Sequence, residues 1–357
     1  MEFSHTIISW FQENGRALPW RETKDPYAIW LSEIILQQTR IAQGWEYWER
    51  FMAQYPKVEN LAAASEDDVL RLWQGLGYYS RARNLHAAAK QIVALGKFPD
   101  TLEGIKTLKG VGDYTAAAIG SFAFDIPAAV VDGNVYRVLS RYFGIDTPIN
   151  TTQGKKEFFA LAQSLIPGSS SEKIRPNEFD MELSPISAYN QGMMDFGAIQ
   201  CTPQSPKCLL CPLAETCVAL REGRVEELPV KLKTLKVQTR RLTYIYIRCK
   251  EASASADSSS SQPLIAIHRR GEGDIWQGLW EPYNVSDLPA LPTFDAPLVL
   301  KAKDVKHVLT HRILLADFYL LETKNRPLLP DDYIWIKESE ISEYGIPRLI
   351  EILLEKL

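Results

Sequence analysis

Apolar and polar residues alternate with a helical period through roughly the first 220 positions of the chain. Two clear examples are EDDVLRLWQGLG and SRARNLHAAAKQIVAL, which are separated from their neighbours by glycine and proline breaks. Apolar residues three and four positions apart place one face of a helix toward a core. Ser65 followed by Asp68 resembles an N-terminal capping signal. The pattern predicts an all-α N-terminal part.

The pattern changes after a linker at about Arg221–Arg241, which is rich in lysine and arginine near its end. Leu242–Cys249 and Pro263–Arg270 are short, partly alternating and rich in β-branched or aromatic residues, which is typical of strands. The Ser/Ala-rich stretch between them, EASASADSSSSQ, predicts a hairpin loop. We therefore expect a smaller mixed α/β domain that runs to Leu357, and we find no internal repeat.

One charged position interrupts the predicted helix IWLSEIILQQTR, Ile29–Arg40. This segment is apolar nearly all the way round, yet Glu33 lies in its middle. A buried carboxylate is costly unless it is paired, and burial raises its pKa. Two explanations stay open at this point. Either Glu33 lies at the surface and pairs with Gln37 or Arg40, or the helix holds it as an acid.

Length and composition describe a soluble multi-domain protein. The 357 residues favour two or three domains, because a single core rarely grows beyond about 250–300 residues. The composition, 46% hydrophobic and 24% charged, is ordinary for globular proteins. There is no apolar run long enough to span a membrane, and the N-terminus lacks the basic start and apolar core of a secretory signal. We expect a cytoplasmic protein.

Charge is unevenly distributed along the chain. The net charge of −4 argues against a basic coat over the whole surface. The segment Arg71–Lys109 nevertheless carries many lysines and arginines and only two acidic residues, Asp100 and Glu103. This segment is either one nucleic-acid-binding face or a solvated helix surface.

Four of the five cysteines lie close together with the spacing C-x6-C-x2-C-x5-C: Cys201, Cys208, Cys211 and Cys217. Disulfides rarely persist in the cytoplasm, so thiols this dense are usually metal ligands. Four thiolates suit either Zn²⁺ or an iron–sulfur cluster. Cys249 lies in a predicted strand, and we expect it to pack in a core.

The stretch LKGVGDYTAAAIGSFAF contains the apolar turn Gly110-Val111-Gly112 between two helices. Glycines allow close approach of the backbone, and amide groups at a helix start can bind a phosphate. Further along, the segment AVVDGNVYRVLSRYF places Asp132 and Asn134 at the start of another helix. Either residue could be the helix N-cap or could have a catalytic role.

The hairpin LKGVG, the aspartate in VDGN and the cysteine spacing occur together and in this order. The chain thereby resembles the helix-hairpin-helix DNA glycosylases with an iron–sulfur cluster, over roughly residues 5–220. The stretches LPWRETKDPYAIWLSEIILQQT and GLGYYSRARNLH resemble the adenine-specific branch of that family. GDIWQGLWEPYNV resembles a segment of the Nudix-like domain that follows the cluster there. No Arg-Glu-x-x-Glu-Glu box follows it, so we do not expect pyrophosphate hydrolysis.

The resemblance implies a multi-domain fold. An all-α helix-hairpin-helix glycosylase domain with a [4Fe–4S] cluster module would be followed by a mixed α/β Nudix-like domain. The first domain would span residues 1–220, with a six-helix barrel at about 20–124 and the iron–sulfur module formed by about 1–19 and 125–220. A linker at 221–240 would lead to a lesion-recognition domain at 241–357.

The resemblance also implies a reaction, which is removal of adenine paired with 8-oxoguanine or guanine in duplex DNA. Glu33 would protonate the flipped base, and Asp132 would stabilise positive charge on the sugar, with Tyr114 and Asn134 in support. The four clustered cysteines would bind the cluster, and a cation at the hairpin phosphate site is a further expectation. We expect a monomer that acts on DNA near the nucleoid and has no membrane partner. The residues implied to contact the base or the DNA are Arg16, Leu18, Trp20, Arg21, Gln37, Gln38, Tyr78, Gly110, Val111, Gly112, Leu309, Thr310 and His311.

The sequence departs from the family at one of these positions. Relatives carry Phe-Ser-His where this chain has Leu309-Thr310-His311. The hydroxyl and the histidine are retained, so hydrogen bonds to the oxidised base remain available. The aromatic ring is lost, which puts a wedge role for Leu309 in doubt. These residues could instead close a corner of the domain.

Two other functions are weighed against this one. An endonuclease III-like enzyme for another base has a lysine where this chain has Tyr114. A DNA-binding redox sensor would have no use for Glu33 together with Asp132. The segment Ser169–Ser187 is longer than the resemblance leads us to expect, and it predicts a surface loop of unassigned function.

Overall fold

The computed structural model describes residues 2–232, 237–250 and 262–357, which form two compact units. The first unit contains Met1–Ala62 and Ala87–Lys233, and the second contains Ala63–His86 and Thr234–Leu357. The second unit therefore includes a helical segment that we expected within the glycosylase domain. The sequence-based domain boundaries stay predictions.

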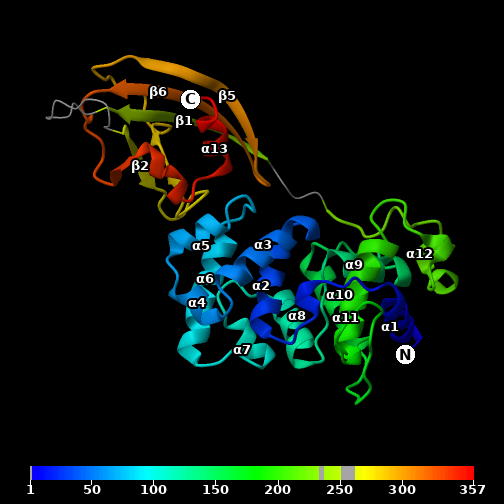
Figure 1. Cartoon of the computed structure of the whole chain (residues 1–357). Helices are drawn as coiled ribbons and strands as arrows, with labels where there is room; N and C mark the ends of the chain where they lie inside the picture. Colours follow the sequence, from blue (N-terminus) through cyan, green and yellow to red (C-terminus); the bar gives the residue numbers. More distant parts are fainter. Residues whose placement is uncertain (1, 233–236, 251–261) are drawn as a thin grey trace. The chain divides into compact units, whose positions relative to one another are not determined.

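Helices dominate the first unit (Figure 1). They are α1 (Glu2–Asn14), α2 (Pro26–Leu36), α3 (Ile41–Gln54), α4 (Val58–Ala63), α7 (Leu102–Lys106), α8 (Asp113–Phe124), α9 (Gly133–Phe143), α10 (Thr152–Ser164), α11 (Pro185–Asp195) and α12 (Val218–Arg221). The second unit begins with α5 (Glu66–Leu72), and α6 (Ser80–Leu95) crosses the boundary in the chain. Short 3₁₀ turns lie at Pro19–Arg21, Cys208–Leu210, Ala214–Thr216 and Glu338–Glu343, and a π turn lies at Phe196–Gln200.

The helix starts follow from capping residues in the sequence. The Ser65 hydroxyl accepts a hydrogen bond from the amide of Asp68 at 3.1 Å, which confirms the predicted cap of α5. The predicted helix SRARNLHAAAKQIVAL is α6, residue for residue. The predicted helix Ile29–Arg40 is shorter than expected, because α2 ends at Leu36.

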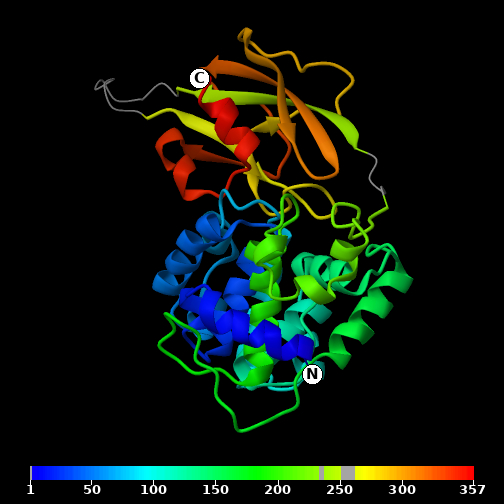
Figure 2. The same ribbon diagram turned by 90° about the vertical axis from the view of Figure 1, so that its right-hand side faces the viewer.

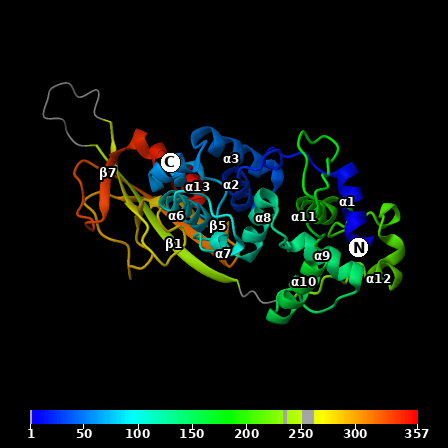
Figure 3. The ribbon, with the colours of Figure 1, turned by 90° about the horizontal axis from the view of Figure 1, so that it is seen from below.

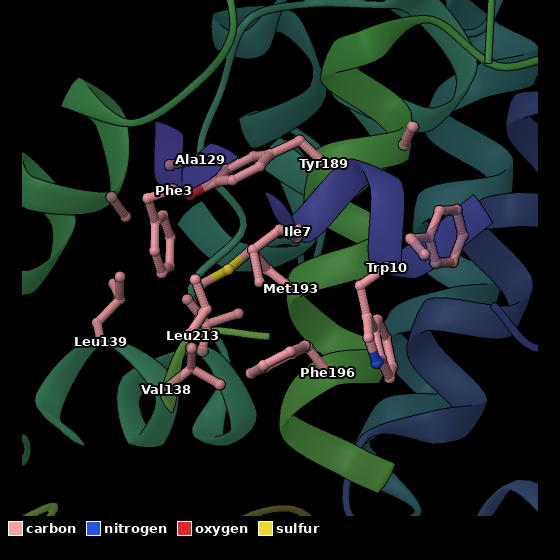
Figure 4. Packing of buried hydrophobic residues seen from close by; sticks show 14 of the residues in the cluster. Phe3, Ile7, Trp10, Ala129, Val138, Leu139, Tyr189, Met193, Phe196 and Leu213 are labelled. Carbon is pink, nitrogen blue, oxygen red and sulfur yellow. The ribbon is translucent and has the colours of Figure 1, made fainter. Parts of the chain in front are cut away.

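One large apolar cluster holds α1, α9, α10 and α11 together. Ile7 of α1 and Met193 of α11 point toward each other in Figure 4, and the Trp10 and Phe196 rings meet edge to face, with centroids 4.9 Å apart. Figure 3 shows α10 and α12 beside α9, in agreement with their contacts. The start of α9, which carries Asp132, is thereby fixed against the helices around it.

The unassigned segment before α11 is anchored to the first unit. It forms the long loop at the lower edge of Figure 2. Ile174 pairs with Leu183 through two backbone hydrogen bonds, and the buried Phe179 ring packs against Phe11 at 5.7 Å. Its polar side chains from Ser169 to Glu182 are exposed, as a surface loop requires, and Phe179 ties it to α1. The prediction of a loop up to Ser187 is wrong at its end, because the buried Ser184 caps α11 and the helix begins at Pro185.

The second unit contains a seven-stranded mixed sheet, which confirms the predicted mixed domain. Its strands are β1 (Gln238–Cys249), β2 (Leu264–Arg269), β3 (Trp280–Glu281), β4 (Tyr283–Asn284), β5 (Leu298–Val308), β6 (Arg312–Thr323) and β7 (Tyr333–Lys337). The main order is β3-β2-β1-β6-β5, with β1 and β6 parallel along their whole length. Helix α13 (Arg348–Leu354) lies across the sheet and buries Leu349, Ile350 and Leu353 (Figure 1).

The two predicted strands correspond to β1 and β2, which pair antiparallel at Cys249 and Leu264. The Ser/Ala-rich stretch predicted as their hairpin loop lies almost entirely outside the described residues. In the described part of the chain, no helix is both long enough and apolar enough to cross a membrane.

Candidate active site

Glu33 lies on a helix that is buried on nearly every side. Asp25 caps α2 by accepting a hydrogen bond from the Tyr27 amide at 3.0 Å, and Pro26 occupies its first turn. All residues from Tyr27 to Ile35 are buried, and Glu33 is only 6% exposed. The open question from the sequence is thus decided by burial. Glu33 is an interior carboxyl, and it forms no surface pair with Arg40.

The hydroxyl of Tyr114 donates a hydrogen bond to Glu33 Oε2 at 2.8 Å. Burial raises the pKa of Glu33 to about 7, although this hydrogen bond and the positive charge of Arg21 partly oppose the shift. The negative charge of Asp132 raises it further. A carboxyl in this state carries its proton in a large fraction of molecules at neutral pH, so it can act as a general acid.

Glu33 faces a cavity of about 210 Å³ in the first unit. The structure brings nine of the sequence-predicted site residues to this one cavity: Arg16, Leu18, Trp20, Arg21, Glu33, Gln37, Tyr114, Asp132 and Asn134. They come from α2, α8, α9 and the segment before α2, so positions more than 100 residues apart in sequence share one site. Their individual roles stay predictions.

Asp132 is both the N-cap of α9 and a wall of the cavity. Its Oδ1 accepts a hydrogen bond from the Val135 amide at 2.8 Å, and its Oδ2 accepts one from Asn134 Nδ2 at 2.8 Å. Burial raises the pKa of Asp132, while these donors oppose the rise. The donors hold both oxygens in fixed positions beside the cavity. The capping and catalytic interpretations are therefore compatible.

Two residues of α11 complete the site, and sequence reasoning missed both. Asp195 is fully buried and accepts two hydrogen bonds from Arg21, at 2.8 and 2.9 Å, and others from Arg16. Burial alone would raise the pKa of Asp195, but the two arginines hold it well below its usual range. This ion pair fixes the arginines that line the cavity.

The second missed residue is Gln191, which lines the same cavity. Its Nε2 donates to Ser187 at 3.0 Å, while its buried Oε1 accepts no hydrogen bond from the described residues. Buried acceptors normally have a partner, so this oxygen is available to a ligand. The sequence held one signal, because Ser187, Gln191 and Asp195 are polar residues four apart in a mostly apolar helix.

The predicted hairpin joins α7 to α8. Gly110 has a φ of 79°, which glycine adopts without strain, and Gly112 is the N-cap of α8. Val111 is buried between them. The geometry has the form expected for a phosphate-binding turn, and the bound cation predicted there stays a prediction.

Residues predicted to enter the duplex lie on exposed turns. Gln38 follows the end of α2, is exposed, and has a φ of 58°. Its neighbour Gln37 donates to Thr115 at 3.3 Å and faces the cavity. In the second unit, Tyr78 is 44% exposed with a φ of 48°, and its hydroxyl hydrogen-bonds to Thr310.

Thr310 and His311 lie at an exposed turn between β5 and β6. The Leu309 amide closes the turn by donating to the Arg312 carbonyl at 2.8 Å. The Leu309 side chain is half-buried and packs against the apolar cluster under the sheet. It therefore contributes to the core of the unit, and a wedge role for Leu309 stays an untested prediction.

The four clustered cysteines line one small cavity of the first unit. Arg141 Nη1 lies 3.4 Å from Cys201 Sγ, and burial raises the thiol pKa of Cys208, Cys211 and Cys217. Among the described residues, no three His, Cys, Asp or Glu side chains are placed to hold a single metal ion. Four thiols that line one cavity can supply the four sulfur ligands of an iron–sulfur cluster.

Helix α9 connects the cysteine loop to the cavity. Arg137 donates from Nε to the Cys201 carbonyl at 2.7 Å and from Nη2 to Asn134 Oδ1 at 2.8 Å. Asn134 in turn donates to Asp132. A continuous hydrogen-bonded path therefore joins the cluster ligand loop to the carboxylate at the helix start.

Comparison with known proteins agrees with this geometry. Residues 31–167 match the HhH-GPD superfamily of base excision DNA repair proteins, residues 201–217 match the iron-sulfur binding domain of endonuclease III, and residues 259–356 match a NUDIX domain. Among solved structures, a thermostable thymine-DNA glycosylase is 31% identical with a TM-score of 0.54, covering 62% of this chain and 96% of that one. A trapped endonuclease III–DNA covalent intermediate, 21% identical with a TM-score of 0.50, covers 62% of this chain and 94% of that one and shares the fold.

Among curated proteins, the adenine DNA glycosylase of Buchnera aphidicola subsp. Schizaphis graminum is 34% identical over 281 residues, covering 78% of this chain and 73% of that protein. The human adenine DNA glycosylase is 38% identical over 237 residues, covering 63% of this chain and 41% of the human protein. The matched length spans less than half of the human protein. With its cysteine cluster and the buried acid facing Asp132, the chain belongs to the adenine DNA glycosylases, helix-hairpin-helix base excision repair enzymes that hold an iron–sulfur cluster.

Proposed function

We propose that this chain removes adenine paired with 8-oxoguanine, and more slowly adenine paired with guanine, from duplex DNA. The observation that carries the proposal is the pairing of two buried carboxyls at one cavity. Glu33 has a pKa of about 7 in a helix that buries it, and Asp132 accepts two hydrogen bonds at the same cavity. Such a pair can divide the roles of acid and charge stabiliser.

The reaction begins with adenine outside the stack, because the glycosidic bond cannot be reached within the duplex. Glu33 donates its proton to a ring nitrogen of the adenine, which then leaves as a neutral base. Positive charge develops on the sugar as the bond breaks, and the ionised form of Asp132 stabilises it. Water then adds to the sugar carbon and gives one proton to the Glu33 carboxylate, which leaves a neutral abasic site and regenerates the acid.

Recognition of adenine is assigned to the arginines and Gln191. The free Oε1 of Gln191 is an acceptor suited to the exocyclic amine of adenine. Arg21 is held by Asp195, so its position does not depend on the ligand. A base with a carbonyl in place of the amine would leave the Gln191 oxygen without a partner, which costs binding.

The product is an intact abasic strand. A lyase step needs an amine nucleophile to form a Schiff base with the sugar. None of the described residues that line the cavity is a lysine, and the place of that lysine in endonuclease III-like enzymes holds Tyr114. The strand should therefore break only after heat or alkali.

Recognition of 8-oxoguanine is assigned to Thr310 and His311, with Tyr78 and Gln38 entering the duplex. The hydrogen bond between Tyr78 and Thr310 supports the proposal that insertion of Tyr78 and recognition of 8-oxoguanine by Thr310 take place at the same location. The variant Thr310→Ala/His311→Ala should reduce the preference for 8-oxoguanine–adenine over guanine–adenine pairs, by about fivefold or more for each lost hydrogen bond. An unchanged ratio at fixed salt would place lesion recognition elsewhere.

The experiment that tests the function uses duplexes with one defined pair. Incubation with an 8-oxoguanine–adenine duplex should release free adenine, and thymine–adenine and 8-oxoguanine–cytosine duplexes should release no base. A further duplex that carries one oxidised pyrimidine tests the endonuclease III-like alternative, which release of that base without release of adenine would favour. Binding to DNA without release of any base would favour the redox-sensor alternative.

The cluster has its own test. The four thiols of Cys201, Cys208, Cys211 and Cys217 fit a [4Fe–4S] cluster. The bound cluster would order the loop that carries Lys207. Protein purified without oxygen should be yellow-brown and contain about four irons per chain. Colourless, active protein with one zinc per chain would contradict the assignment.

A further inference from the structure

The loop between α5 and α6 has an unusual backbone. Gly75, Gly77 and Tyr78 have φ values of 96°, 70° and 48°. Glycine adopts this left-handed region freely, but a bulky aromatic residue rarely does. A strained conformation at Tyr78 persists only where neighbouring groups determine it. The contacts of Tyr78 within the second unit therefore deserve a functional explanation.

Trp73 holds the backbone of this loop. Its indole is fully buried, and its Nε1 donates to the carbonyl of Gly77 at 2.9 Å. The hydrogen bond ties the residue before Tyr78 to the end of α5. The backbone position from which the Tyr78 side chain leaves is thereby fixed.

Arg81 holds the ring. Its guanidinium carbon lies 5.2 Å from the centroid of the Trp73 ring and 5.3 Å from the centroid of the Tyr78 ring. A planar guanidinium can stack on aromatic faces and attract them electrostatically. Burial lowers the pKa of Arg81 to about 10, so the group is still charged at neutral pH. The buried Trp73 thus supports Arg81, and Arg81 supports Tyr78.

The far end of Tyr78 is also fixed, because its hydroxyl hydrogen-bonds to Thr310. The ring is nevertheless 44% exposed. A side chain that is exposed and already ordered loses little rotamer freedom when it stacks on a base. These contacts are the arrangement expected for a preformed stacking surface.

We propose that Arg81 is a positioning residue that holds the Tyr78 ring, against Trp73, in the orientation that stacks into DNA beside 8-oxoguanine. The inference rests on the proposed role of Tyr78 in the duplex. It assigns Arg81 no contact with the DNA. Its influence on lesion recognition passes through Tyr78.

Two properties separate this role from an ordinary phosphate contact. Lysine keeps the charge but lacks the planar group, so Arg81→Lys should lose the stacking and keep the attraction to phosphate. The dependence of binding on salt reports the number of phosphate contacts, so it should not change in this variant. Arg71 offers a matched control, since it is an exposed arginine of the same unit that pairs with Asp68.

The test measures binding to a duplex with 8-oxoguanine opposite a non-hydrolysable 2′-fluoro-adenosine, with 2-aminopurine beside the lesion as a reporter of stacking. Arg81→Lys should weaken binding about tenfold. Stacking of Tyr78 should quench the 2-aminopurine fluorescence of the wild-type complex, and in Arg81→Lys this fluorescence should return toward that of free DNA. The salt dependence of binding should stay as in wild type. Arg71→Lys should behave as wild type. In a Tyr78→Leu background, Arg81→Lys should have no further effect, because residues that act as one unit are not additive.

The outcomes are distinguishable. Wild-type binding by Arg81→Lys, an undiminished effect in the Tyr78→Leu background, or a reduced salt dependence would each overturn the positioning role while leaving Tyr78 as the wedge. If Tyr78→Leu itself binds and quenches the reporter as wild type does, the wedge assignment fails and the inference fails with it. Adenine release by Tyr78→Leu at substrate saturation tests the glycosylase function separately. Near-ultraviolet circular dichroism of each variant shows whether the aromatic packing is intact.

Discussion

Two buried glutamates, one in each unit, have similar burial but pKa values that are shifted in opposite directions. Glu33 in the first unit is 6% exposed and accepts a hydrogen bond from Tyr114 at 2.8 Å. Glu281 in the second unit is 1% exposed and accepts one from Tyr244 at 2.9 Å. Burial raises the pKa of Glu33 to about 7, whereas the pKa of Glu281 is lowered.

The difference lies in the remaining partners of the two carboxylates. Burial also acts to raise the pKa of Glu281, but hydrogen bonds from His268, Asn284 and the charged Arg270 outweigh it, with Arg270 Nη1 at 2.5 Å. Among the described residues, no arginine hydrogen-bonds to Glu33, and Asp195 engages Arg16 and Arg21. At similar burial, the hydrogen-bonding and charged partners of each glutamate decide whether its pKa is raised or lowered. Asp195 therefore supports the proposed acid role of Glu33 indirectly, because its ion pair with Arg21 weakens the influence of that positive charge on Glu33.

The largest effect is expected from removing the acid itself. Glu33→Gln keeps the shape but cannot donate a proton, so the single-turnover rate of adenine release should fall by about 10²- to 10⁴-fold. Binding to the lesion duplex should be retained. Glu281→Gln is the matched control, and in folded protein it should release adenine at close to the wild-type rate. Near wild-type release by Glu33→Gln would refute the assignment of the acid.

The second effect concerns the stability of the folded protein when Glu281 is ionised and loses its arginine partner. Arg270→Met leaves Glu281 buried without its cation, which should cost about 3–5 kcal/mol of unfolding free energy. Arg241→Met in the same unit breaks an exposed pair with Asp304 and should cost at most about 1 kcal/mol. Chemical denaturation of both variants at pH 7 measures the difference. Equal losses would mean that the buried pair is no more important than the exposed one.

The third effect is a gain in the unfolding free energy, whereas the second is a loss. The folded-state pKa of Glu33 lies above its unfolded value, so the folded protein binds an extra proton between the two, and stability falls as pH rises through this range. Glu33→Gln removes this penalty and should raise the unfolding free energy by about 3 kcal/mol at pH 8. At about pH 3 the carboxyl is protonated in nearly all molecules of both states, and the gain should vanish. A destabilised Glu33→Gln variant at pH 8 would show that Glu33 is not held as an acid.

The smallest effect on catalysis is expected from removing the tyrosine hydroxyl that hydrogen-bonds to Glu33. The Tyr114 hydroxyl lowers the pKa of Glu33, so Tyr114→Phe should raise it and move the alkaline decline of adenine release upward by about one pH unit. Tyr244→Phe, which alters the corresponding bond to Glu281, should leave this decline in place. The pH dependence of the single-turnover rate in the three proteins measures the shift, and a downward shift in Tyr114→Phe would contradict the account.

The sequence predicted local features of the site well. An acid in the middle of an apolar helix and an aspartate before a helix start are visible within about one helical turn of sequence. Both turned out to face the same cavity. The cysteine spacing likewise predicted a metal site before any fold was known.

Long-range features were not predictable in the same way. The ion pairs of Asp195 join it to Arg16 and Arg21, which lie more than 170 positions away, and no local pattern marks such a partner. The parallel pairing of β1 with β6 and the contact of Tyr78 with Thr310 depend on how the chain returns to the sheet. The side chain of Leu309 turned inward because the turn geometry, closed by the Arg312 carbonyl, allows it to pack in the core.

Titration of the Glu33 carboxyl shows directly whether burial holds this group as an acid near neutral pH. Protein labelled with ¹³C at the glutamate side-chain carboxyl would be titrated by nuclear magnetic resonance, with Glu33→Gln used to assign the signal. One carboxyl signal should titrate at about pH 7 and be missing from Glu33→Gln. A Glu33 signal that titrates in the ordinary range of about 4 to 5 would contradict this prediction.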